Sequence, residues 1–274
     1  KKLEALADAL RDAGVDVAVL ANNHCCDNGA EGIRTSVEEL DRCGIRHTGA
    51  FADSADYKKN NPLYLTHCGI RLAIVNYTYG TNGMPVPEGT VVNLIDTVRM
   101  AADLAAARAS GVDFIVACVH WGDEYQRREN AAQRSLAAFL RRHGTDVVVG
   151  SHPHVIQPMK VMHNKKNNKD VLVVYSLGNF ISNMKTGPTR GGALVKVMLQ
   201  RQPDGRVTWS NPVYDTFYSS KPCAELRNYQ VIPSWRSDMI PAAQRGWWNT
   251  FNTSALNIFN KYNVNVPRDT ASHL

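Results

Sequence analysis

The segment Asp146-Val-Val-Val-Gly-Ser-His-Pro-His154 is the most informative stretch of this chain about its fold. Its three valines predict a short buried strand, and Gly150 predicts the sharp turn that ends it. In α/β folds, chemistry collects in the loops at the carboxyl ends of strands. His152 and His154 lie in such a loop, and one residue apart their imidazoles can reach adjacent points of one site.

Two other apolar runs end in the same way. The run from Val15 to Leu20 leads into Asn22-Asn23-His24, and the run from Asp113 to Val119 leads into His120-Trp121-Gly122. A single histidine after a strand is more often a structural hydrogen-bonding residue than a ligand. Three such loops favour a shared polar site instead. Because imidazole is a common ligand of zinc, manganese and iron, we expect this site to bind metal.

Composition places the chain among ordinary soluble globular proteins. It has 274 residues, 44% hydrophobic and 20% charged, which is enough for one large domain or two small ones. No apolar run approaches the roughly 20 residues that span a bilayer, and no signal peptide is visible. The first residues already read as a helix and no initiator Met precedes them, so we expect a fragment whose leader or anchor lies upstream.

The net charge of +6 is scattered along the sequence. Positive charges are concentrated in one place, Lys165-Lys166 with Lys169, which is expected at a solvated hairpin tip between Asn164 and Asp170. The charge therefore gives no reason to expect nucleic-acid binding, although it suits an anionic substrate or polymer.

Helical and strand-like segments alternate through the first half, which predicts an α/β fold, mixed with α+β features. Expected helices cover residues 1–13, 32–43, 93–110 and 129–143. Expected strands cover 15–20, 45–49, 113–119 and 146–149, with a hairpin over 63–77 that turns near Cys68-Gly69. Residues 78–88 form a long loop of the kind that is often functional.

From Val155 the pattern changes to antiparallel strands. Residues 155–162, 171–178, 193–200 and 206–209 are expected to extend the sheet. A helix within 239–262 carries an aromatic stripe, which is more typical of packing than of a sugar or cofactor site. We therefore divide the chain into a core at 1–210 and an aromatic-rich extension at 211–274 that packs on it.

Four motifs together resemble the CapA family of capsule and poly-γ-glutamate biosynthesis proteins, within the calcineurin-like metallophosphoesterase superfamily. They are Asn22-Asn23-His24, His120-Trp121-Gly122, Gly150-Ser-His-Pro-His154 and Tyr175-Ser-Leu-Gly-Asn-Phe180. The resemblance spans Ala21 to Ser182 with the motifs in the family's order. It implies a metallophosphoesterase-like four-layer α-β-β-α sandwich and a site for two divalent ions, Mn, Fe or Zn.

The resemblance also implies roles for individual residues. His24 would be the catalytic general acid, and Asn22 and Asn179 would contact substrate. An equally good structural interpretation has Asn179 bonding to local backbone. The implied metal ligands are Asn23, His120, His152 and His154.

One departure from the family concerns carboxylates. The family's Gly-Asp strand and a later acidic motif precede the first helix, and neither is in this chain, so we expect a core that is truncated at its N-terminus and lacks the bridging aspartate. Asp27, Asp123 and Glu124 are candidate ligands by position. The last two are equally suited to cap the helix that follows.

The predicted function is divalent-metal-dependent hydrolysis of a phosphoester or amide bond in capsule or poly-γ-glutamate biosynthesis. The alternative is a non-catalytic polymer-binding or export and assembly factor with the same fold, and a third is a histidine-rich structural domain. Expected partners are an anionic polymer or phosphorylated substrate and membrane-bound capsule synthesis proteins, but not nucleic acid. By the same resemblance, the protein belongs to the bacterial cell envelope, membrane-anchored or secreted.

Overall fold

The computed structural model describes residues 2–164 and 168–270, and the chain divides into two compact units. Unit 1 comprises Lys1–His120 with His143–Thr145, and unit 2 comprises Trp121–Arg142 with Asp146–Leu274. Both units combine helices with β-strands, so the predicted mixed α/β class is confirmed. The four-layer sandwich stays a prediction. The boundary expected between residues 210 and 211 falls inside a strand.

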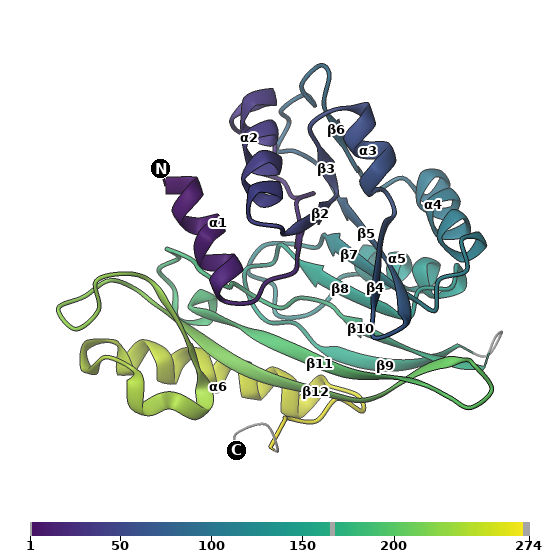
Figure 1. Ribbon diagram of the computed structural model, residues 1–274. Coiled ribbons are helices and arrows are strands. Elements are labelled where there is room, and N and C mark those ends of the chain that lie inside the picture. Colours follow the sequence, from purple (N-terminus) through teal and green to yellow (C-terminus); the bar gives the residue numbers. More distant parts are fainter. Residues whose placement is uncertain (1, 165–167, 271–274) are drawn as a thin grey trace. The chain divides into compact units, whose positions relative to one another are not determined.

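Unit 1 begins with the alternation that the sequence predicted (Figure 1). Its β1 and β2 pair in parallel, with Val17 opposite Arg46. The helices are α1 (Lys2–Asp12), α2 (Gly29–Arg42), α3 (Ser54–Asn60) and α4 (Thr97–Ala109). The strands are β1 (Val17–Val19), β2 (Arg46–Thr48), β3 (Ala50–Phe51), β4 (Leu63–His67), β5 (Ile70–Thr78), β6 (Val91–Val92) and β7 (Phe114–His120).

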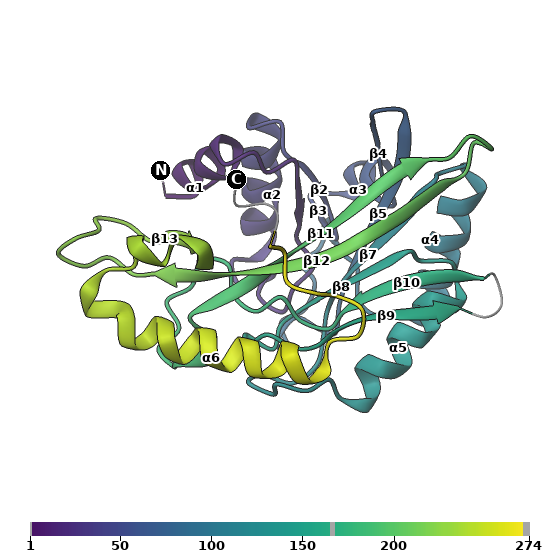
Figure 2. The same ribbon diagram turned by 90° about the horizontal axis from the view of Figure 1, so that it is seen from below.

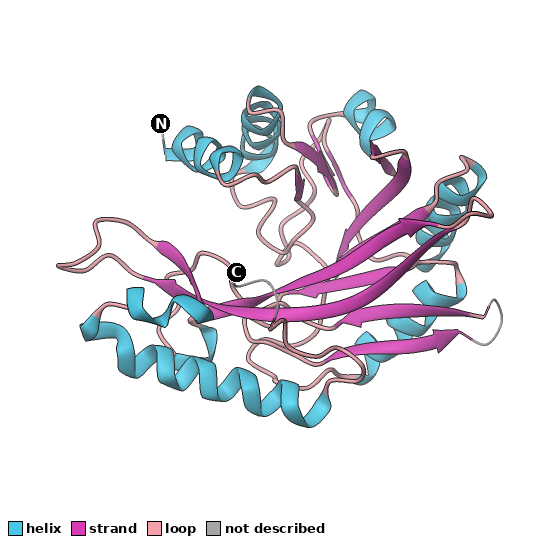
Figure 3. Cartoon of the chain, turned by 60° about the horizontal axis from the view of Figure 1, so that its bottom comes forward, coloured by secondary structure: helices cyan, strands magenta, loops and turns pink. Residues whose placement is uncertain are grey.

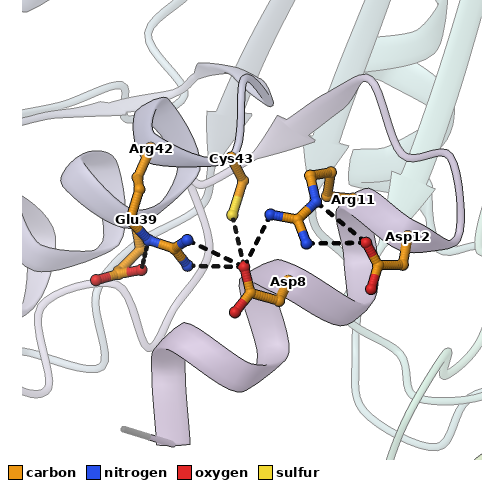
Figure 4. A network of polar contacts seen from close by, with 6 residues as sticks. All are labelled: Asp8, Arg11, Asp12, Glu39, Arg42 and Cys43. Atoms are coloured by element: carbon orange, nitrogen blue, oxygen red, sulfur yellow. Dashed lines mark hydrogen bonds and ion pairs between the residues drawn. The ribbon is translucent and has the colours of Figure 1, made fainter.

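The first two helices are joined by apolar packing and by a polar network. Ala7 packs in one cluster with Leu40 and Ile45. Around it, the Asp8 carboxylate accepts from Arg11, from both terminal nitrogens of Arg42 at 3.0 Å and from the Cys43 thiol (Figure 4). The Arg42 hydrogen bonds are the main cause of the lowered pKa of Asp8. Because this network lies at the surface, the apolar cluster supplies most of the stabilisation.

The predicted hairpin and the strand that precedes His120 form the second part of unit 1. β4 and β5 pair antiparallel around Cys68 and Gly69, both with positive φ, as the sequence indicated. β5 then pairs in parallel with β7, and this register sets Thr78 opposite His120. The loop after β5 therefore starts beside the histidine that ends β7.

Unit 2 contains two sheets (Figure 2). In the first, β8 (Val147–Ser151) pairs in parallel with β10 (Lys169–Val174), which pairs antiparallel with β9 (Met159–Asn164). In the second, β11 (Gly191–Arg201), β12 (Val207–Ser220) and β13 (Gln230–Pro233) form an antiparallel sheet of their own. The helices are α5 (Ala131–Arg142) and α6 (Arg245–Tyr262), with short 3-10 turns at Gly187–Thr189, Ser234–Met239 and Ala242–Gln244.

The prediction that the later strands extend the same sheet is confirmed for β9 and β10, which join β8, and was wrong for β11 and β12. β11 and β12 pair with each other over ten residue pairs and form a separate layer. Helix α6 runs along this layer (Figure 3) and buries Phe251 and Phe259. The Phe259 ring lies 4.2 Å from that of Tyr214 on β12. The aromatic stripe therefore packs, as predicted. The tip of the predicted lysine-rich hairpin, residues 165–167, lies outside the described residues.

Two helices differ from the sequence prediction at their start. Helix α3 was missed, although Asp53 caps it by accepting from the backbone N–H groups of Ala55 and Asp56. Helix α4 begins at Thr97 rather than at Asn93, because Asp96 caps it and because the Asn93 side chain is buried and donates to the Asn76 carbonyl. Within the described residues, no helix has the length and apolar character that crossing a bilayer requires.

A buried ion pair in unit 2 makes the first testable prediction. Lys160 Nζ lies 2.5 Å from Glu129 Oε1, and the Glu129 side chain is almost fully buried. Burial acts to raise the pKa of Glu129, but the Lys160 hydrogen bond and charge outweigh it and hold that pKa below its usual value. This contribution to stability is present above the usual glutamate pKa and is lost as the pH falls through the lowered one.

Lys160→Met should therefore lower the free energy of unfolding at pH 7 by about 3–5 kcal/mol, because it removes the hydrogen-bonded cation of a buried carboxylate and leaves only Arg128, at 3.7 Å. The loss should be smaller at pH 4, where Glu129 of the variant is protonated. Urea unfolding at both pH values measures this, with the exposed Lys58→Met as a control that changes stability by less than about 0.5 kcal/mol. Equal losses at the two pH values would contradict the assignment.

Candidate functional site

The first motif loop is held in place by a buried asparagine that the sequence analysis missed. Asn76 on β5 accepts from the Ala21 backbone N–H at 2.7 Å and donates to the Cys118 carbonyl at 3.2 Å. It is 2% exposed. A Cβ on Gly49 would lie 1.9 Å from its Oδ1, so glycine is required there. Asn76 thus fixes the chain just before Asn22 and just before His120. In the sequence, Asn76 is marked by being an asparagine within an otherwise apolar strand.

Asn23 and His120 are brought together in unit 1. Asn23 Oδ1 and His120 Nε2 lie 2.8 Å apart, and Asn23 is 4% exposed. The Asn23 amide nitrogen donates to Asn82 Oδ1 at 3.1 Å. Tyr79 donates to the same oxygen and its ring stacks on His120. Asn82 and Tyr79 come from the long loop that the sequence marked as functional, although neither was named.

His24 is exposed and paired with a carboxylate. Its Nδ1 lies 2.7 Å from Asp27 Oδ2. This bond orients the ring and leaves the other ring nitrogen, Nε2, available for proton transfer. Asp27, a candidate metal ligand by position, is therefore engaged with His24. Asn22 holds the loop itself, because it accepts from the His24 N–H at 2.8 Å and donates to the Leu20 carbonyl.

A pocket of about 200 Å³ opens beside this histidine. Ile33 and Ala50 give it an apolar floor, while Asn22 and His24 contribute polar groups. His24 therefore borders a space large enough for a small chemical group.

The second histidine loop lies in unit 2, where the backbone is strained at both histidines. His152 has φ +103° and His154 has φ +58°, values that side-chain-bearing residues rarely adopt. A Cβ on Gly150 would lie 2.1 Å from the Tyr175 carbonyl oxygen, which also accepts from the Trp121 indole. Glycine is therefore required at position 150, but the turn predicted there was wrong, because β8 continues through Gly150 to Ser151. Strain of this kind is typical of functional sites.

His154 is oriented by Asn179. Its Nδ1 lies 2.8 Å from Asn179 Oδ1, while the Asn179 amide nitrogen donates to the carbonyls of His154 and Thr189. Because Oδ1 can only accept, Nδ1 carries the proton and Nε2 presents its lone pair. Metal-binding histidines commonly have this arrangement. Asn179 thus makes local contacts, and its predicted contact with substrate stays a prediction.

The neighbouring acids have different environments. Glu124 Oε1 lies 3.9 Å from His154 Nε2. Asp123 Oδ2 instead accepts from the side chain of Asn130, which caps α5 in a reciprocal pair with Gln133. Asp123 therefore supports the start of the helix, in agreement with its structural interpretation. Tyr125, another residue the sequence did not flag, stacks on His154.

The donor atoms fit a borderline divalent ion in their chemistry. In unit 1 the amide oxygen of Asn23 accepts from His120 Nε2, so this ring nitrogen carries the proton and Asn23 Oδ1 keeps one lone pair for a ligand. In unit 2 the Nε2 lone pair of His154 is available. Over residues 2–164 and 168–270, no three His, Cys, Asp or Glu side chains are grouped to hold a metal ion, so the four-residue ligand set stays a prediction.

The chain matches the model of a known protein family. The family model of the bacterial capsule synthesis protein PGA_cap matches residues 1–184, which include all four motifs. The chain belongs to this family. The resemblance found in its motifs is confirmed.

Relatives share part of their length with it. The PGA biosynthesis protein CapA of Bacillus subtilis (strain 168) is 30% identical over 198 residues, covering 72% of this chain and 50% of the relative. The capsule biosynthesis protein CapA of Bacillus anthracis is 29% identical over 202 residues, covering 72% and 47%. The chain spans about half the length of these relatives.

Similar solved structures include metallophosphoesterases. The calcineurin-like phosphoesterase YfkN from Bacillus subtilis matches with a TM-score of 0.47 at 14% identity, over 95% of this chain and 77% of that chain. The 5'-nucleotidase from Candida albicans SC5314 matches with a TM-score of 0.42 at 13% identity, over 89% and 43%.

The Asn76 contacts predict a local effect on the first motif loop. Asn76→Ala leaves the buried Ala21 N–H without its acceptor and should cost about 1–3 kcal/mol of stability. Hydrogen exchange at the Ala21 amide should accelerate more than at the amides of β1. The exposed Asn249→Ala on α6 is the control. Unchanged exchange at Ala21 would show that Asn76 does not hold the loop.

The Asn179 contacts predict a single His154 tautomer. Nitrogen-15 NMR of the metal-free protein should show Nδ1 protonated and Nε2 unprotonated. In Asn179→Ala both tautomers should be populated, and the affinity for Mn²⁺ or Zn²⁺ should fall about 10–100-fold. Mixed tautomers already in the unmodified protein would contradict the orienting role of Asn179.

Proposed function

We propose that this chain is a divalent-metal-dependent hydrolase that cleaves a phosphoester or amide bond in capsule or poly-γ-glutamate biosynthesis. Membership of the PGA_cap family supports the process. The observation that carries the chemistry is the exposed His24–Asp27 pair, in which His24 lines a pocket and directly follows Asn23. The partner proteins of this chain would be membrane-bound capsule synthesis components at the bacterial cell envelope.

The side chains take distinct roles in this reaction. Asn23, His120, His152 and His154 would hold the metal, which would supply Lewis acidity at the scissile bond. His24 would give the proton on Nε2 to the leaving group, and Asp27 would keep the imidazolium oriented through Nδ1. Asn22 would maintain the loop that presents His24.

Substituting His24 tests this role directly. His24→Ala should keep the bound metal but lose about 10²–10⁴-fold in kcat with phosphoesters or γ-glutamyl peptides, since general acid catalysis contributes that much. Asp27→Asn should lose less, because the proton donor remains. The measurement is turnover with each substrate class, combined with metal analysis of both variants.

The chain offers a matched control for this experiment. His163 Nδ1 pairs with Asp170 Oδ1 at 2.9 Å, and both side chains are as exposed as His24 and Asp27. His163→Ala should leave kcat unchanged. Equal effects of His24→Ala and His163→Ala would contradict the proposal. Polymer binding without turnover would favour the second candidate, a polymer-binding or assembly factor, which the basic character of the chain suits.

A further inference from the structure

Three basic side chains gather in unit 2, outside the four motifs. They are Lys185, Arg190 and Lys221, here called the basic cluster. Arg190 Nη2 and the Lys221 backbone N–H both donate to Gln244 Oε1, each at 3.1 Å. The pKa of Lys221 is lowered, first by burial and then by the positive charges of Arg190 and Lys185. Gln244 thus brings Arg190 and Lys221 together, and the Lys221 ammonium donates to the Asn183 carbonyl at 2.8 Å, two residues before Lys185.

The basic cluster has no carboxylate partner. Across residues 2–164 and 168–270, no Asp or Glu oxygen lies within 4 Å of these three side chains. Yet Arg190 is only 7% exposed, and its Nε has no hydrogen-bond partner in the described part of the chain. A buried arginine is almost always paired, because an unpaired buried charge is costly. An oxyanion bound beside Arg190 would compensate this charge.

The surroundings of Arg190 are built from neutral groups. Its guanidinium carbon lies 5.5 Å from the Tyr218 ring and 5.4 Å from the Trp247 ring. Gln244 Oε1 accepts three donors, from Arg190, Lys221 and Tyr218, so hydrogen-bond donors outnumber acceptors. Aromatic faces hold the guanidinium without neutralising its charge. The arrangement favours an oxyanion that accepts from the edge of the guanidinium.

The basic cluster is joined to the histidine loop through the backbone. Arg190 directly follows Thr189, whose carbonyl accepts from the Asn179 amide that orients His154. The Asn179 backbone N–H in turn donates to the Gly191 carbonyl. Both neighbours of Arg190 are therefore bonded to the residue that positions His154. A chain with repeated anionic groups, bound at the cluster, would be positioned relative to the catalytic histidines.

We propose that the basic cluster is a binding subsite for an oxyanion group, carboxylate or phosphate, of a polyanionic substrate. Arg190 would engage the oxyanion with its guanidinium edge, and Lys185 and Lys221 would attract the neighbouring anionic groups. The subsite deepens the proposed function and rests on it only for the identity of the polymer.

Binding of fluorescent poly-γ-glutamate, measured by anisotropy on the whole 274-residue chain, tests the subsite. The double variant Lys185→Gln/Lys221→Gln should bind at least about tenfold more weakly, a loss of about 1.4 kcal/mol, because two cations of the basic cluster are removed. The matched control, Lys58→Gln/Lys59→Gln on α3, removes the same net charge at exposed positions and should change the Kd less than about twofold.

Arg190→Lys adds a test that keeps the charge and removes the guanidinium fork. It should weaken binding while thermal unfolding shows a folded protein. Competition by polyphosphate or by unlabelled poly-γ-glutamate distinguishes phosphate from carboxylate as the preferred group. Equal weakening in the two double variants, or no binding of either polymer by the unmodified chain, would overturn the subsite.

The subsite and the hydrolase can fail separately. Binding that depends on the basic cluster, without any metal-dependent turnover, contradicts the hydrolase and leaves the subsite standing. Metal-dependent turnover, combined with polymer binding that does not depend on the basic cluster, contradicts the subsite and leaves the hydrolase standing.

Discussion

The first motif loop depends on the hydrogen bonds that Asn76 makes with buried backbone groups. The loop after β1 must leave the strand with its Ala21 N–H buried, and a buried donor without an acceptor is costly. Asn76 supplies the acceptor and bonds with its other end to Cys118, two residues before His120. One amide therefore sets the positions of Asn23 and His120, whose side chains meet at 2.8 Å.

In unit 2, a glycine and a second asparagine hold the histidine loop in place. Gly150 allows the chain to pass against the Tyr175 carbonyl, after which His152 and His154 adopt positive φ values. The amide of Asn179 bonds to the His154 ring, to the His154 carbonyl and to the Thr189 carbonyl. In both units an asparagine amide contacts a motif histidine, His120 in unit 1 and His154 in unit 2, whereas the Asp27 carboxylate orients His24. The family to which the chain belongs supplies the context in which these pairs are interpreted.

Local patterns predicted most of the fold. Apolar runs that end in glycine or histidine marked β1, β7 and β8, and the Cys68-Gly69 turn marked the β4–β5 hairpin. Helix α3 was missed because it is only seven residues long, and its signal, the cap at Asp53, is local and weak. The separate β11–β12–β13 layer was missed because alternation predicts a strand but not the sheet it joins.

The candidate site was only partly predictable for a related reason. The histidines stand in recognisable motifs, whereas their supporting residues are distant in sequence: Asn76 is 55 residues from Ala21, and Asn179 is 25 residues from His154. In the basic cluster, Arg190 and Lys221 are likewise joined through Gln244, which is distant from both in sequence.

The central claim is that the histidine loops form a metal-dependent centre. Elemental analysis of the purified protein, after reconstitution with Mn²⁺, Fe²⁺ or Zn²⁺, tests it most directly, with His152→Ala/His154→Ala measured alongside. We predict near-stoichiometric metal in the unmodified protein and its loss in the variant. Absence of metal from the reconstituted protein, or equal metal in both, would contradict the account.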